Sequence, residues 1–150
     1  MPMLPRDAPA ATKRRLDYRP PAFLVDRVAL EFDLDPAATE VKATLAFRRN
    51  PAADPRDRRA PLVLDGEQQA IVRVELGGRA LSSAEAIATT AGLTIPDAPD
   101  AGTLVVRTRT APERNVALEG LYVSSGVFCT QCEAEGFRRI TYFPDRPDVL

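Results

Sequence analysis

Hydrophobic and polar residues alternate along several short segments of the chain, a pattern typical of β-strands. In the first such segment, the apolar positions are Val28, Leu30, Phe32 and Leu34. An extended strand places alternate side chains on opposite faces, so we expect these four to face a core and their neighbours to face water. The turn-forming segment 35–38 follows, which predicts a hairpin with the next strand.

The second strand of this hairpin shows the same alternation. Its inward apolar set is expected to be Val41, Ala43, Leu45 and Phe47. Further short strands are predicted at 62–64, 72–76, 86–89, 93–95 and 104–110, with a polar loop at 50–61 and a tight turn at Gly77-Gly78. No segment of helical length carries an apolar stripe at a period of 3.6 residues. The chain is therefore predicted to be all-β, either a β-sandwich or a saddle-shaped β-sheet.

The domain organisation follows from a change of composition near Pro20-Pro21. Residues 1–21 are rich in Pro, Arg and Ala and are predicted to form a flexible N-terminal arm, and residues 22–150 one β-rich domain. The arm has no apolar segment typical of a secretory signal. No stretch approaches the ~18 apolar residues of a membrane span. We therefore expect a cytoplasmic location and no membrane partner.

Charge and residue type exclude several classes of function. The formal net charge of −1 gives no long-range field, so we expect no nucleic-acid partner. The arginines are scattered, and the pair Arg138-Arg139 is interpreted as solvated surface. The chain contains no histidine, which excludes a His-containing catalytic triad and an H-E-x-x-H zinc site within these 150 residues.

Two cysteines at the spacing C-x-x-C, Cys129 and Cys132, are the first chemical candidates. A thiol redox pair would be expected at a helix start beside parallel strands, and that context is missing. A structural zinc site needs four ligands, and the chain has no second Cys or His pair. Two reduced, structurally placed thiols are the favoured interpretation, and a reversible disulfide and intermolecular metal binding stay open.

Two carboxylates close to these cysteines are the second candidate. Glu133 and Glu135 lie two residues apart, so on an extended segment they would point to the same side, beside the amide of Gln131. Such an acceptor-rich pocket suits an ammonium group better than a phosphate, and a buried carboxylate there could serve acid–base chemistry. Taken alone, the segment is better explained as a solvated acidic loop.

Three blocks of sequence in this order carry a resemblance: residues 115–122, residues 129–138, and residues 140–143 with 145–150. They resemble the aminopeptidase N branch of the zinc-dependent M1 aminopeptidases of bacteria. Looser agreement over the rest of the chain extends the resemblance to nearly all of it after the arm.

This resemblance implies a specific fold and role. The chain would be the β-rich, saddle-shaped N-terminal domain, which caps one side of the active site. Glu133 would accept hydrogen bonds from the free α-ammonium of a peptide substrate, and Gln131 would line the pocket for its first side chain. Family members tend to have a cis peptide bond after this glutamate, so we expect a cis Glu133–Ala134 bond.

The resemblance also implies what lies outside this chain. The family's G-A-M-E-N segment and its H-E-x-x-H zinc helix belong to the next domain, which would be the chain's partner. Zinc is therefore expected in the full-length enzyme and none in this chain, which is expected to hold no catalytic residue and to be inactive alone. Because relatives continue past the position of Leu150, the β-domain is expected to be truncated at its C-terminal end.

Two other function classes stay open from the sequence. One is a stand-alone β-sandwich adhesion or scaffold module, in which the acidic loop is incidental. The other is a thiol oxidoreductase that uses Cys129 and Cys132. The preferred N-terminal residue of a substrate and the oligomeric state do not follow from the residues.

Overall fold

Short strands and single turns of 3-10 helix are the regular elements of residues 14–149, which the computed structural model describes. The predicted all-β class is confirmed. No helix in this range is long and apolar enough to cross a membrane. The strands are β1 (Phe23–Asp33), β2 (Thr39–Arg49), β3 (Leu62–Asp65), β4 (Ala70–Leu76), β5 (Arg79–Ala80), β6 (Ile87–Ala88), β7 (Gly92–Ile95), β8 (Ala101–Thr110), β9 (Gly120–Ser124) and β10 (Val127–Gln131). The 3-10 turns are η1 (Arg15–Asp17), η2 (Pro55–Asp57), η3 (Pro112–Arg114) and η4 (Phe137–Arg139).

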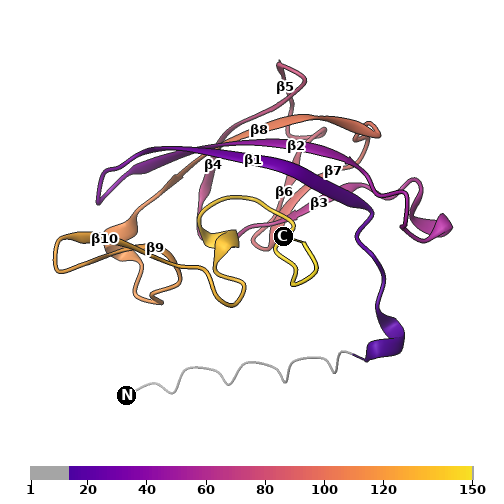
Figure 1. The fold of residues 1–150 in the computed structure, drawn as a ribbon. Coiled ribbons are helices and arrows are strands. Elements are labelled where there is room, and N and C mark those ends of the chain that lie inside the picture. Colours follow the sequence, from indigo (N-terminus) through magenta and orange to yellow (C-terminus); the bar gives the residue numbers. More distant parts are fainter. Residues whose placement is uncertain (1–13, 150) are drawn as a thin grey trace.

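The largest sheet has five antiparallel strands in the order β1-β2-β8-β4-β5 and arches across the molecule (Figure 1). Its β1-β2 hairpin is the one predicted from the alternation. Asp35 holds the hairpin turn, because its Oδ1 accepts hydrogen bonds from the backbone N–H groups of Ala37 (2.8 Å) and Ala38 (2.9 Å). This is the local bonding that makes Asp a frequent turn residue.

The core forms between this sheet and a three-stranded sheet of order β3-β7-β6, which lies beneath it (Figure 1). The four apolar residues predicted to face inward on β2 are all buried. Leu93 of β7 and Leu104 of β8 are fully buried in the same cluster. Because each Leu that is removed from water contributes about 1.5–3 kcal/mol, this interface is the main source of the fold's stability.

The predicted burial of the first strand is wrong for Val28, Phe32 and Leu34, which are 39%, 42% and 51% exposed. The register still places Val28 and Phe32 on the core side of the sheet, since they lie opposite the buried Leu45 and Val41. Strand β1, however, is at the edge of the sheet. The three-stranded sheet packs instead near the start of β1, where Phe23 belongs to the hydrophobic core. The alternation correctly identified the face of β1 that carries apolar residues. It did not show whether another element packs against that face.

A second hairpin, β9-β10, lies below one end of the large sheet (Figure 1) and was not predicted. Its two-residue turn is Ser125-Gly126, with φ angles of 49° and 78°. Two successive positive φ angles are typical of the tight turns that join twisted antiparallel strands. The Ser-Gly pair between two β-branched segments was the available signal, and it was missed.

The predicted N-terminal arm, residues 1–21, lies partly outside the described residues. Residues 14–21 contain η1 and contact the C-terminal segment: the Tyr18 hydroxyl donates a hydrogen bond to Asp148 (3.0 Å), and Arg146 donates one to the carbonyl of Arg19 (2.8 Å). The flexibility of the arm stays a prediction.

Candidate functional site

The segment singled out from the sequence is an exposed turn directly after β10. Gln131 is the last residue of the strand, and its side-chain Nε2 donates a hydrogen bond to the carbonyl of Glu133 (3.0 Å). The N–H of Gly136 donates to the carbonyl of Cys132 (2.9 Å) and closes the turn. The Glu133–Ala134 peptide bond is cis, which confirms the prediction. Gln131 and Glu133 are thus brought together by local backbone geometry.

The two glutamates of this turn have different surroundings. They do not lie on an extended segment, so the basis for a shared direction was wrong: the chain leaves the sheet after Gln131, and Glu135 has a φ of 68°. The Glu135 carboxylate lies 3.7 Å from Nη2 of Arg138. Within residues 14–149, no hydrogen bond or ion pair reaches the Glu133 carboxylate, which is exposed to solvent. Glu133 is therefore the carboxylate available to an external cation.

Two glycines allow the backbone to pack closely around the turn. A Cβ on Gly136 would lie 2.5 Å from the carbonyl oxygen of Gln131, and one on Gly120 would lie 2.6 Å from Cβ of Arg139. Gly120 also has a φ of +73°, which favours glycine. The start of β9 can therefore lie directly against the end of the turn.

Arg138 and Arg139 anchor the turn to the body of the protein. Each side chain is only 16% exposed, so their interpretation as solvated surface was wrong. Arg139 lies 3.2 Å from a carboxylate oxygen of Glu67 and 3.2 Å from one of Glu119. Arg138 pairs with Asp145 at 3.0 Å. Since these partners are distant in sequence from one another, no local spacing signalled the anchoring role.

The segment after the turn is fixed to β3. The backbone of Phe143 exchanges hydrogen bonds with that of Asp65, at 2.8 and 3.1 Å. The ring of Tyr142 packs over Gly66 so closely that a Cβ there would lie 2.2 Å from it. The ring of Phe143 also meets that of Phe137 edge to face at 5.1 Å. The base of the turn is therefore part of the hydrophobic core, although its tip is in solvent.

Both cysteines are free thiols, Cys129 partly buried and Cys132 exposed, in agreement with the favoured interpretation. Burial raises the pKa of the Cys132 thiol, and the negative charge of Asp145 raises it further. A thiol with a raised pKa is a weak nucleophile at neutral pH, because the thiolate is the reactive form.

A metal site is not found among the described residues: in 14–149, no three side chains of His, Cys, Asp or Glu cluster in a way that could hold an ion. The whole chain also has no histidine. These residues do not fit a catalytic zinc ion, which needs three nitrogen, oxygen or sulfur ligands around an open position.

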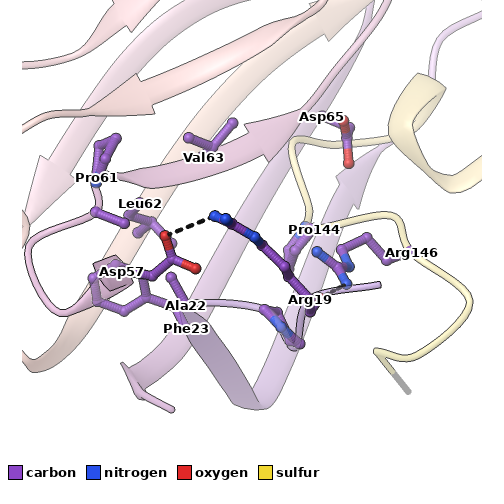
Figure 2. A pocket seen from close by; sticks show the side chains of 12 residues that line it. Arg19, Ala22, Phe23, Asp57, Pro61, Leu62, Val63, Asp65, Pro144 and Arg146 are labelled. Carbon is purple, nitrogen blue, oxygen red and sulfur yellow. Dashed lines mark hydrogen bonds and ion pairs between the residues drawn. The ribbon is translucent and has the colours of Figure 1, made fainter. Parts of the chain in front are cut away.

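A cavity of about 440 Å³ lies elsewhere, between the N-terminal segment, β3 and the C-terminal segment (Figure 2). Arg19 crosses it and lies 3.7 Å from the carboxylate of Asp57, and Arg146 is paired with Asp148 at 2.7 Å. Gln131 and Glu133 do not line it. Because the charges of both arginines are compensated within the protein, we regard the cavity as a junction between segments.

Comparison with known proteins gives consistent relatives. No family model matches the chain. Aminopeptidase N of Caulobacter vibrioides is 49% identical over 134 residues, which are 89% of this chain and 15% of the relative. The chain thus spans about 15% of the length of the curated relatives it matches. The crystal structure of Legionella pneumophila aminopeptidase A in complex with aspartic acid superposes with a TM-score of 0.82, at 34% identity, over 91% of this chain and 16% of that one. An M1 zinc metallopeptidase mutant from Deinococcus radiodurans, bound to a Tyr-Ser-Ala substrate, shares the fold over 85% of this chain and 30% of that one, with a TM-score of 0.65 at 18% identity.

Proposed function

Because this chain is homologous to one segment of bacterial aminopeptidase N and has the fold of M1 metallopeptidases, we propose that it is the part of a zinc-dependent aminopeptidase that binds the substrate's free α-amino group. The resemblance seen in the sequence extends over about nine tenths of the chain in these relatives. The activity, the peptide substrates and the partner domain of the longer protein belong to this proposal.

The unpaired carboxylate of Glu133 is the observation that carries the proposal. It projects from a turn whose base is fixed in the core, and the neighbouring Glu135 is already paired with Arg138. A carboxylate that meets an ammonium group away from bulk water forms charge-assisted hydrogen bonds, which are shorter and stronger than neutral ones. In this chain the site is open, so the partner domain would have to exclude the water.

Selectivity for a free N-terminus follows from the same pairing. An internal segment of a peptide offers no ammonium group, so its binding would leave the Glu133 carboxylate desolvated and unpaired. Gln131, whose amide holds the carbonyl of Glu133, would line the pocket of the first substrate side chain. Zinc would be held by the rest of the longer protein, where it would activate a water molecule for hydrolysis.

The test is Glu133→Gln in the full-length protein, with steady-state kinetics on a chromogenic aminoacyl substrate. The amide keeps the size of the side chain and removes its charge. Loss of a charge-assisted hydrogen bond is worth about 1.5–3 kcal/mol, so kcat/KM is expected to fall roughly 10- to 100-fold, mainly through KM.

Glu135→Gln is the matched control. It removes a like charge two residues away from Glu133, and this charge is already paired with Arg138. Its kcat/KM is expected to change less than that of Glu133→Gln. Equal effects of the two substitutions, or unchanged kinetics of Glu133→Gln, would refute the role assigned to Glu133.

A further inference from the structure

Arg138 is bound at its backbone and at its side chain. Its N–H and its Nε donate hydrogen bonds to the same oxygen of Asp145, at 3.1 and 3.0 Å, and its Nη2 donates to the Asp145 carbonyl at 3.0 Å. Its own carbonyl accepts hydrogen bonds from the N–H of Glu67 (3.0 Å) and from the side chain of Gln69 (2.7 Å). Two separate segments, at Asp145 and at residues 67–69, therefore hold this residue in place.

The same guanidinium also faces the turn. Its Nη2 lies 3.7 Å from Oε1 of Glu135, whose side chain is 52% exposed. The Glu135 carboxylate is thus drawn toward the base of the turn and its charge is partly compensated.

The link from Arg138 to Glu133 is short. The turn is closed by the hydrogen bond from Gly136 to Cys132, and its other end is held by the side chain of Gln131. The close approach of Gly136 to the Gln131 carbonyl leaves the turn little room to shift as a unit. A displacement of Arg138 would therefore move the turn, and with it the carboxylate of Glu133.

We propose that Arg138 is a positioning residue for Glu133: it fixes the turn against Asp145 and draws Glu135 aside, so that Glu133 alone is presented to the substrate ammonium. The inference rests on the proposed function of Glu133. Arg138 does not touch the substrate, and it acts only through the position of Glu133.

The experiment compares Arg138→Gln with Arg139→Gln in the full-length protein. Both arginines are 16% exposed and both are ion-paired, but only Arg138 contacts Glu135 and Asp145. Arg138→Gln is expected to raise KM for an aminoacyl substrate about tenfold with kcat within about twofold, and Arg139→Gln to raise KM clearly less. Similar KM values for the two variants would overturn the proposal, because they would indicate a common structural effect.

Arg138→Lys is the second variant, in case the glutamine variant does not fold. Lysine retains the charge that faces Glu135 but cannot reproduce the fork of bonds to Asp145. Its KM is expected to lie between those of the unmodified protein and Arg138→Gln. A KM equal to that of the unmodified protein, with Arg138→Gln also unchanged or unfolded, would overturn the positioning role.

The double variant with Glu133→Gln separates this inference from the function on which it rests. If Arg138 acts through Glu133, adding Arg138→Gln to Glu133→Gln raises KM by less than about twofold further. Additive effects would overturn the positioning role and leave Glu133 as the ammonium site. Unchanged KM in Glu133→Gln alone would refute the proposed function itself, and the positioning role with it.

Discussion

At the scale of single residues, the candidate site depends on positions that have no side chain. Gly120 begins β9 beside the end of the turn, and its φ of +73° lies in the left-handed region. A Cβ there would lie 2.6 Å from Cβ of Arg139 and 3.2 Å from the carbonyl oxygen of Gly136. The contact is with the rigid stem of Arg139 and with backbone, so neither can move away easily.

Gly120→Ala is therefore expected to destabilise the protein by about 2–4 kcal/mol, through left-handed strain and overpacking together. Gly126→Ala is the control, because Gly126 has a similar φ of +78° but nothing within 4 Å of its Cβ position. Gly126→Ala should lower the free energy of unfolding through the left-handed backbone strain alone, by about 1 kcal/mol. Denaturant unfolding of the unmodified protein and of the two variants measures both losses of stability. Equal losses would show that the close contact at Gly120 is unimportant.

At the scale of elements, β1 and β2 present the same face of one sheet but are covered unequally. Leu45 of β2 is 1% exposed, whereas Val28, directly opposite on β1, is 39% exposed. A row of half-exposed apolar residues on an edge strand is a surface that another chain or domain can cover. The strand pattern is the same in both strands, and only the packing of the three-stranded sheet distinguishes them.

Truncation of this cross-strand pair tests the difference. Leu45→Ala is expected to lower the free energy of unfolding by about 2–5 kcal/mol, because it leaves a cavity in a closed core. Val28→Ala should cost no more than about 1 kcal/mol, because the site is already open to water. Chemical denaturation followed by circular dichroism gives both values, and a larger loss at Val28 would show that the edge of the sheet is covered in solution.

At the scale of the whole molecule, polar contacts join the two ends of the described chain. Asp148 accepts hydrogen bonds from Arg146 (2.7 and 2.8 Å) and from the Tyr18 hydroxyl (3.0 Å). Arg146 in turn donates to the carbonyl of Arg19. The hydrogen bond from Arg146 is the main reason why the pKa of Asp148 is lowered from its usual 3.8, and the bond from Tyr18 contributes.

This contact is expected to weaken in acid. Because the folded-state pKa of Asp148 lies below its unfolded value, the unfolded chain binds the proton first as pH falls. The stabilisation is therefore complete above about pH 5 and is lost as pH falls through the folded pKa. The side chains of Arg146 and Asp148 are partly exposed to solvent, so the contribution is small, about 0.2–1 kcal/mol.

Thermal unfolding of the unmodified protein and of Asp148→Asn at pH 7 and pH 3 measures this contribution. Asp148→Asn is expected to lower the Tm at pH 7 by at most about 4 °C and to have little effect at pH 3. The same difference in Tm at both pH values would contradict a contribution from the charged carboxylate.

Much of the fold could be predicted from alternation along the chain. The β1-β2 hairpin follows from patterns of period two and most of β8 from its β-branched residues, and the burial of the β2 face was correct residue by residue. The β9-β10 hairpin was missed because five-residue strands provide little alternation, and its signal lay in the Ser125-Gly126 turn. Prediction failed where an element is short or where its environment depends on distant elements.

By itself, the sequence determined the all-β class, because this depends on side-chain alternation between neighbours in the chain. The turn that brings Gln131 close to Glu133 was expected to be an extended segment, and only the structure showed that the chain turns there. Only the tertiary structure decided which apolar rows are covered and which partners bind Arg139. Arg139 meets Glu67 and Glu119 only after β3 and β9 pack against the segment that carries it. The pattern along the chain contains no measure of such distances, because they arise from the packing of segments far apart in sequence.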